Sequence, residues 1–249
     1  MASIAKKIVL VTGANSGVGL ELSAQLLSKG HHVLLGHRNP SKGTTALQHL
    51  QSLNLPGTQE LVHLDVTDDA TITAAASTIA NTHGKLDILV NNAAVALPPG
   101  TTDRLQLQQA FDTNAIGPYV LTKALLPSLL ASTDPSGARV INISSGIGSI
   151  GRKMDTTSPF HKFGGVPYRS SKTALNMVSA CQYVEYGDLG IKVFLYDPGF
   201  TVSNLSENNT AEKGARSARE SVLPLMDVLE GRRDDECGGF LHNTGSWPW

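Results

Sequence analysis

The amino-acid sequence predicts a single α/β domain, residues 1–249, in which helices cover both faces of a parallel sheet of about seven strands. Short apolar runs alternate with longer amphipathic segments, which is the pattern of repeated strand–helix–strand units. A chain of 249 residues with 41% hydrophobic and 16% charged residues can bury the core that such a domain needs. The first strand also leads directly into a glycine-rich turn and a helix, as in doubly wound folds.

Each predicted strand is a short run rich in Val, Ile and Leu, the composition of strands buried on both faces of a sheet. In chain order these strands are Lys7–Thr12, His32–Gly36, Glu60–Leu64, Leu86–Asn91, Arg139–Ser144, Ile191–Tyr196 and Gly239–His242. Apolar residues at helical spacing predict the helices Gly17–Ser28, Lys42–Leu53, Asp68–Thr82, Asp103–Leu130, Val166–Tyr186 and Glu212–Leu229. Right-handed crossovers place the loops after the strands at one edge of the sheet, so a ligand site is expected there.

The formal net charge of -1, with acidic and basic residues interspersed, gives no long-range attraction to nucleic acid or to an anionic membrane. The apolar run Ile8–Val11 is too short for a signal peptide or a membrane span. Cys181 and Cys237 lack metal-type spacing and are too few for a disulfide framework. We therefore expect a cytoplasmic protein with no metal site, no nucleic-acid partner and no membrane association.

The segment after the first predicted strand has the composition of a loop that binds a dinucleotide pyrophosphate. Glycines let the chain turn tightly, admit the anion close to the backbone, and bring the next helix near the sheet with its N-terminus facing the anion. The spacing Gly-x-x-x-Gly-x-Gly departs from the general pattern, and a glycine triplet alone can be only a turn. Its position between strand and helix favours a Rossmann-type cofactor site formed by Gly13, Asn15, Ser16, Gly17, Val18 and Gly19.

The residues after the second and third predicted strands favour NADP(H) over NAD(H). An NAD site usually carries an acidic residue about 20 residues beyond the glycines, where this chain has Arg38 and then Lys42. Guanidinium and ammonium groups match the charge of a 2′-phosphate, although Lys42 can also be a solvated charge at a helix start. Asp65, with Val66, is predicted to contact the adenine ring; the alternative is that Asp65 caps the next helix.

Further motifs, in order along the chain, resemble those of the classical short-chain dehydrogenase/reductase family. They are Asn91-Asn92-Ala93-Ala94, Asn114, Ile143-Ser144-Ser145, Tyr168-Arg-Ser-Ser-Lys172 and Pro198-Gly199, with Ala94 in place of a more usual glycine. The long separation of Ser145 from Tyr168, together with Arg38, resembles NADPH-dependent carbonyl reductases. The resemblance implies cofactor contacts for Asn92, Ala93, Pro198, Gly199 and Thr201, ribose binding by Lys172, and a water-linked proton path from Asn114 to Lys172.

The spacing of Tyr168 and Lys172 itself supports acid–base chemistry. Residues four apart share one face of a helix, so the ammonium should lie near the phenol and lower its pKa from about 10. Tyr168 can then donate a proton to a carbonyl oxygen, while Ser145 stabilises the developing oxyanion. Strand alternation sends Ser144 and Ser145 to opposite faces, and the family pattern chooses Ser145. Taken singly, each residue can be structural: a core tyrosine, a surface lysine, and serines that form a turn.

Together the motifs predict an NADP(H)-dependent reductase that transfers hydride to a ketone, aldehyde or quinone. The alternatives are a dehydrogenase that oxidises an alcohol and a regulator that binds NADP(H) without turnover. Substrate choice is expected in the loops Ala96–Thr102, Gly146–Pro167 and Thr201–Lys213. The sequence leaves open a monomer, homodimer or homotetramer, and it leaves open whether the tail with Trp247 and Trp249 closes the pocket or a subunit contact.

Overall fold

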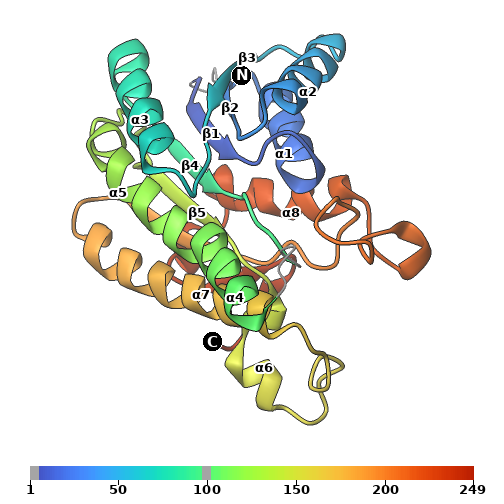
Figure 1. The fold of residues 1–249 in the computed structure, drawn as a ribbon. Helices are drawn as coiled ribbons and strands as arrows, with labels where there is room; N and C mark the ends of the chain where they lie inside the picture. Colours follow the sequence, from blue (N-terminus) through green and yellow to red (C-terminus); the bar gives the residue numbers. More distant parts are fainter. Residues whose placement is uncertain (1–5, 97–101) are drawn as a thin grey trace.

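Short strands rich in Val, Leu and Ile form the sheet at the centre of the molecule (Figure 1). The computed structural model describes residues 6–96 and 102–249. The strands are β1 (Ile8–Thr12), β2 (His32–His37), β3 (Thr58–His63), β4 (Ile88–Asn91), β5 (Arg139–Ile143), β6 (Lys192–Tyr196), β7 (Phe240–His242) and β8 (Gly245–Ser246). Their order is β3-β2-β1-β4-β5-β6-β7-β8, and all neighbours pair in parallel except β7 and β8. This order is that of a doubly wound sheet, as predicted.

The sheet has an apolar core on each face because its strands alternate side chains between two helical layers. In β1, Val9 and Val11 join the cluster that contains Leu22 and Leu26, whereas Leu10 joins the cluster on the opposite face. All five of these side chains are fully buried. Strands covered on both faces need apolar residues at successive positions, which explains why the strands read as continuous apolar runs.

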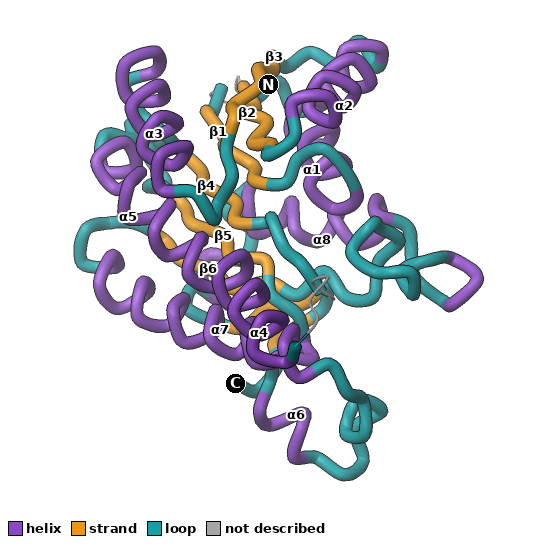
Figure 2. The backbone as a smooth tube through the Cα atoms, in the orientation of Figure 1, coloured by secondary structure: helices purple, strands orange, loops and turns teal. Residues whose placement is uncertain are grey.

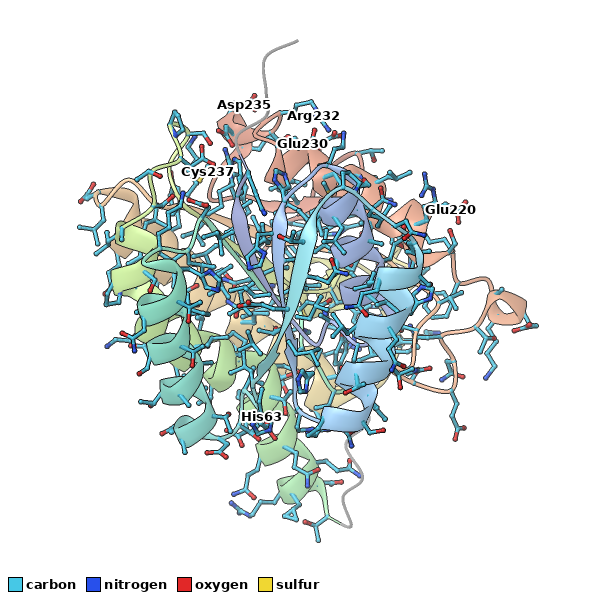
Figure 3. The ribbon with its side chains drawn as sticks, turned by 90° about the horizontal axis from the view of Figure 1, so that it is seen from above. His63, Glu220, Glu230, Arg232, Asp235 and Cys237 are labelled. Atoms are coloured by element: carbon cyan, nitrogen blue, oxygen red, sulfur yellow. The ribbon has the colours of Figure 1, made fainter. Side chains whose placement is uncertain are left out.

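Two layers of helices cover the sheet. On one face lie α1 (Gly17–Ser28), α2 (Pro40–Ser52) and α8 (Ala218–Leu229); on the other lie α3 (Asp69–His83), α5 (Gly117–Leu130) and α7 (Val166–Gly187) (Figure 2). Seen from above, the strands run between α1 and α2 on one side and α3 and α5 on the other (Figure 3). The helix α4 (Asp103–Phe111) packs on α7 and continues into α5. Within residues 6–96 and 102–249, no helix combines the length and hydropathy needed to cross a membrane.

The structure confirms the predicted fold class and differs from the prediction in four main details. In the part of the chain that the structure describes, the sheet has eight strands rather than about seven, since β8 pairs back onto β7. The helix predicted over Asp103–Leu130 contains a π-helical turn at Asp112–Ile116 between α4 and α5. The helix predicted from Glu212 begins at Ala218, because Ser217 and Glu220 form a capping box there. A short helix, α6 (Ile150–Met154), lies in the segment Gly146–Pro167, which was predicted to be a loop.

Candidate active site

A cleft of about 560 Å³ lies at the carboxyl ends of the parallel strands, where the sheet order predicts a ligand site. Most of the residues proposed from the sequence line it: Gly13, Asn15, Ser16, Gly17, Val18, Arg38, Lys42, Asp65, Val66, Asn92, Ala93, Ser145, Tyr168, Lys172, Pro198, Gly199 and Thr201. The remaining two proposed residues, Gly19 and Asn114, pack behind residues of this lining. The fold thus gathers segments that are up to about 190 residues apart in the sequence.

The glycine loop after β1 leaves the start of α1 open toward the cleft. Ser16 precedes the helix in an extended conformation, and its side chain makes no capping hydrogen bond, so the first-turn N–H groups of α1 remain free for an anion. Gly17 has a φ of 54°, which favours glycine. A Cβ at Gly19 would lie 2.5 Å from both the Gly13 carbonyl oxygen and the Asn92 side-chain nitrogen. Glycine at position 19 therefore lets the helix start approach the loop after β4.

The loop after β4 is hydrogen-bonded to the glycine loop. Thr12 Oγ1 accepts hydrogen bonds from the backbone nitrogens of Asn92 and Ala93, both at 2.9 Å. The Asn92 side chain donates in return to the Thr12 carbonyl oxygen at 2.8 Å and to the Gly13 carbonyl oxygen at 3.3 Å. These bonds hold two walls of the cleft in one rigid arrangement.

Arg38 and Asp65 face each other across one end of the cleft. The Arg38 side chain is 67% exposed, and its Nε lies 3.9 Å from Asp65 Oδ2. Lys42 is exposed in the first turn of α2. Asp65 does not cap α3, because Asp68 is the N-cap residue; Asp65 Oδ1 instead accepts hydrogen bonds from the Thr67 backbone nitrogen and hydroxyl. The cap alternative for Asp65 is therefore wrong.

Tyr168, Ser145 and Lys172 meet at the centre of the cleft. Tyr168 lies in the first turn of α7, and the Ser145 side chain is close enough to its hydroxyl to lower the pKa of the phenol. Lys172, one turn further on, is buried; its Nζ donates to the Ile143 carbonyl oxygen at 2.8 Å and lies 5.8 Å from the centre of the Tyr168 ring. The helical spacing thus brings the two side chains together as predicted.

Burial controls the proton affinities of this group more strongly than the tyrosine–lysine pairing does. Desolvation lowers the pKa of Lys172 to about 7, and the charge of Asp197 opposes this shift. Desolvation and then the Asp197 charge raise the pKa of Tyr168, which the hydrogen bond from Ser145 only partly offsets. The expectation that Lys172 would lower the pKa of Tyr168 is not met in this state of the protein.

The two neighbouring serines at the end of β5 have different surroundings. Ser144 is buried, and its hydroxyl donates to Asn176 Oδ1 at 2.7 Å on α7. Ser145 is partly exposed to the cleft and pairs with Tyr168. The hydroxyl of Ser144 is thus hydrogen-bonded within the fold, whereas Ser145 lines the cleft.

Asn114 occupies the π-helical turn and connects the loop after β4 to α7. Its side-chain oxygen accepts from the Val95 backbone nitrogen at 2.8 Å. Its side-chain nitrogen donates to the Val95 carbonyl oxygen at 2.8 Å and to Ser171 Oγ at 2.9 Å. Ser171 directly precedes Lys172, so Asn114 holds the helix segment that carries the lysine. Single π-helical turns within α-helices are frequent at functional sites.

Asp197 is a residue of the cleft that the sequence analysis missed. It is only 6% exposed, its Oδ1 accepts from the Gly199 backbone nitrogen, and its Oδ2 accepts from Trp247 Nε1, each at 2.8 Å. The Arg152 guanidinium stacks on the Trp247 ring at 3.7 Å from its centre. An acidic residue directly before Pro198 at a strand end was the available signal.

The loops predicted to shape the substrate site contribute unequally. The middle of the loop Ala96–Thr102, residues 97–101, lies outside the described residues. The segment Thr201–Lys213 supplies Ser203, Asn204, Leu205 and Asn209 to the cleft lining. The C-terminal tail packs within the same chain: the Trp249 carbonyl oxygen accepts from the Gly151 backbone nitrogen at 3.0 Å, and the C-terminus lies near α6 (Figure 1).

The chain matches known proteins over most of its length. The short chain dehydrogenase family matches residues 7–214. A short-chain dehydrogenase of Penicillium roqueforti is 36% identical over 246 residues, which cover 97% of this chain and 95% of the relative. A short-chain dehydrogenase/reductase of Talaromyces stipitatus is 34% identical over 263 residues, with 96% of each chain covered.

Two solved structures share the architecture. NADPH-bound carbonyl reductase from chicken fatty liver aligns with a TM-score of 0.83 and 30% identity, over 99% of this chain and 100% of that chain. Carbonyl reductase Sniffer of D. melanogaster aligns with a TM-score of 0.81 over 98% of this chain and 99% of that chain, and its 23% identity shows a likeness of fold. The ordered motifs, the sheet order and these matches agree that the chain belongs to the short-chain dehydrogenase/reductase family, with a fold like that of carbonyl reductases.

Proposed function

We propose that this protein is an NADPH-dependent reductase that transfers hydride to the carbonyl carbon of a ketone, aldehyde or quinone, with Tyr168 as general acid. The observation that carries the proposal is that Tyr168 and Ser145 line one cleft side by side, next to the buried Lys172. A phenol and a hydroxyl at one point can protonate and stabilise a carbonyl oxygen during reduction.

The residues of the cleft fit a dinucleotide phosphate. The open first turn of α1, with Gly13, Asn15, Ser16, Gly17, Val18 and Gly19 around it, suits the pyrophosphate. Arg38 and Lys42 supply two cations at the far end for the 2′-phosphate, beside Asp65 and Val66 for the adenine. The remaining walls, Asn92, Ala93, Pro198, Gly199 and Thr201, would then flank the ribose and nicotinamide. The relative from chicken fatty liver, whose structure is described as NADPH bound, supports this choice of cofactor.

The protonation state of Tyr168 suits the reductive direction. Because burial and Asp197 raise the pKa of its phenol, Tyr168 carries its proton near neutral pH and can donate it to a carbonyl oxygen. Bound NADPH supplies the hydride, which is delivered to the carbonyl carbon. Ser145 then donates a hydrogen bond to the same oxygen as negative charge develops on it. Hydride at the carbon and the Tyr168 proton at the oxygen together convert the carbonyl to an alcohol.

Lys172 and Asn114 support this step without supplying the proton to the substrate. Lys172 is positioned by the Ile143 carbonyl to hold the ribose hydroxyls beside Tyr168. Asn114 fixes the Lys172 segment through Ser171 and belongs to the water-linked route that returns a proton to Lys172. The free cysteines, Cys181 and Cys237, agree with a reducing, cytoplasmic setting for this chemistry.

The test is oxidation of NADPH with a panel of activated ketones, aldehydes and quinones, compared between the parent protein and Tyr168→Phe. Loss of a positioned general acid should lower turnover by about 10²- to 10⁴-fold. Tyr183→Phe is the matched control, because Tyr183 lies on the same helix, 42% exposed. This control should retain parental turnover.

The same assay separates the alternatives. If the protein oxidises alcohols with NADP⁺ but reduces no carbonyl with NADPH, the alcohol dehydrogenase alternative is favoured. Tight NADPH binding without turnover of any carbonyl or alcohol would favour the regulator. Full activity in Tyr168→Phe would refute the proposed role of Tyr168.

A further inference from the structure

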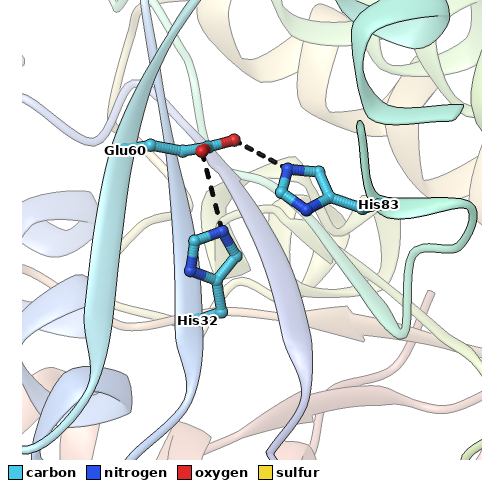
Figure 4. A group of neighbouring side chains, drawn as sticks. All are labelled: His32, Glu60 and His83. Carbon is cyan, nitrogen blue, oxygen red and sulfur yellow. Dashed lines mark hydrogen bonds and ion pairs between the residues drawn. The ribbon is translucent and has the colours of Figure 1, made fainter. Parts of the chain in front are cut away.

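Three possible metal ligands meet on the sheet at a distance from the cleft. His32 is the first residue of β2, Glu60 lies within β3, and His83 is the last residue of α3 (Figure 4). The cleft lies at the opposite, carboxyl ends of these strands. The sequence analysis predicted no metal site from the spacing of the two cysteines, and it did not consider these three residues, which come from separate segments of the chain.

The geometry of the three side chains converges on one point. Figure 4 shows the Glu60 carboxylate between the two imidazoles. Glu60 Oε1 lies 2.7 Å from His83 Nε2, and Glu60 Oε2 lies 3.9 Å from His32 Nε2. One ligand atom from each residue lies within 4.8 Å of the others. A tetrahedral Zn²⁺ ion with bonds of about 2.0 Å holds its ligand atoms about 3.3 Å apart. Shifts of roughly an ångström therefore suffice to close the site around an ion.

The nitrogen of His32 that faces this point makes no hydrogen bond. His32 Nε2 is buried, so water does not satisfy it on the surface. On the other side of the ring, His32 Nδ1 lies 2.7 Å from the Thr58 hydroxyl oxygen. If Nδ1 carries the proton and donates it to Thr58, the lone pair of Nε2 points toward the Glu60 carboxylate. A lone pair that faces a carboxylate is electrostatically unfavourable, but it becomes favourable when a cation lies between His32 Nε2 and the Glu60 carboxylate.

We propose that His32, Glu60 and His83 bind a divalent transition-metal ion of the Zn²⁺ class. Two imidazole nitrogens and one carboxylate oxygen form a ligand set that such ions prefer. Donation from Nδ1 to the Thr58 hydroxyl would hold the His32 imidazole in the tautomer that leaves Nε2 free, which is the usual arrangement around a metal-binding histidine. Three protein ligands leave a fourth position for water, and the 38% exposed Glu60 side chain provides a path of entry.

The ion would connect three elements at an edge of the sheet. β3 is the outermost strand and pairs with β2. A metal ion shared by β2, β3 and the end of α3 would hold this edge strand to its neighbours. Because binding requires the folded arrangement, it should raise the thermal unfolding midpoint without being required for hydride transfer.

The test uses tag-free, metal-stripped protein titrated with Zn²⁺ by calorimetry and with Co²⁺ by visible absorption. One equivalent should bind, and Zn²⁺ should raise the unfolding midpoint. Loss of a hydrogen bond to a metal ligand typically weakens metal affinity by about 10- to 100-fold, so Thr58→Val should weaken Zn²⁺ binding within this range. His32→Gln and His83→Gln, which remove a ligand, should weaken Zn²⁺ binding by more than this. Glu60→Gln, of nearly the same shape, tests the carboxylate if a histidine variant folds poorly.

His49→Ala is the matched control, since His49 is an exposed histidine on α2, outside the cluster. It should bind one equivalent with parental affinity. NADPH binding should remain unchanged in every variant, which shows that the fold is intact. The proposal is overturned if the parent binds no stoichiometric metal, or if His32→Gln and Glu60→Gln bind it as the parent does. In that case Glu60 and His83 form only an ion pair.

Discussion

Arg38→Ala tests the cofactor assignment through one exposed side chain. Arg38 follows β2 at the end of the cleft, 67% exposed, with its Nε 3.9 Å from Asp65 Oδ2. Arg219 offers a closely matched control outside the cleft lining: its side chain is 66% exposed and its Nη1 lies 3.9 Å from Glu21 Oε1. The two substitutions remove the same charge from similar surroundings, so the main difference between them is that Arg38 lines the cleft and Arg219 does not.

The magnitude follows from the phosphate that NADPH carries and NADH lacks. Hydrogen bonds to charged groups contribute about 1.5–3 kcal/mol, and the exposure of Arg38 favours the lower end. Since 1.4 kcal/mol is tenfold in affinity, Arg38→Ala should weaken NADPH binding by about 10- to 100-fold. The carboxylate of Asp65 would then face the phosphate without its cationic neighbour, which adds to the loss. The affinity for NADH should change by less than about threefold, because it makes no such contact.

The assay is fluorescence titration of NADPH and NADH with the parent, Arg38→Ala and Arg219→Ala, each at low and high salt. The preference of the parent for NADPH should decrease at high salt, because an exposed charge pair is screened. Equal affinities in the parent, or a preference that survives in Arg38→Ala, would refute the phosphate assignment. A similar loss in Arg219→Ala would show that only the overall charge matters.

Ser145→Ala should lower kcat by about 10²- to 10³-fold in steady-state assays, whereas Ser144→Ala should mainly lower the unfolding free energy, by about 1 kcal/mol. Gly19→Ala should weaken NADPH binding and lower the free energy of unfolding by about 1–3 kcal/mol in denaturant titrations, because the added Cβ would clash with the Gly13 carbonyl oxygen. Lys172 has a folded pKa of about 7, below its unfolded value of 10.5. Between pH 7 and pH 10.5 the unfolded chain therefore binds more protons than the folded protein, so the free energy of unfolding of the parent should rise with pH. The slope should exceed that of Lys172→Met by at most about 1.4 kcal/mol per pH unit. Parental kcat in Ser145→Ala, parental NADPH affinity in Gly19→Ala, or equal pH slopes for the parent and Lys172→Met would contradict these expectations.

The parts of the site that were predictable from sequence depend on short-range geometry. Tyr168 and Lys172 share a helix face because they are four residues apart, and that relation holds in any α-helix. The glycine loop is recognisable because its residues meet the needs of a tight turn and a helix start within seven positions. The edge of the sheet that carries the site was also predictable, since right-handed crossovers place the loops after parallel strands together, whereas the order of the strands comes from the structure.

Helix boundaries were less predictable where local signals compete. The periodic pattern runs from Glu212, yet α8 starts at Ala218, because the Ser217 and Glu220 cap determines the first helical residue. The π-helical turn around Asn114 leaves no clear trace in the sequence. Its effect is to aim the Asn114 amide at Val95 and Ser171, which only the assembled helices can define.

By itself, the sequence determined the fold class, the glycine loop and the pairing of Tyr168 with Lys172, because each rests on contacts between residues close in the chain. Only the tertiary structure decided the proton affinity of Tyr168, since that depends on how much water the surrounding elements exclude and on the charge of Asp197. The same holds for the convergence of His32, Glu60 and His83. Contacts between distant segments form only when the sheet and its helices assemble, and no spacing in the sequence records them.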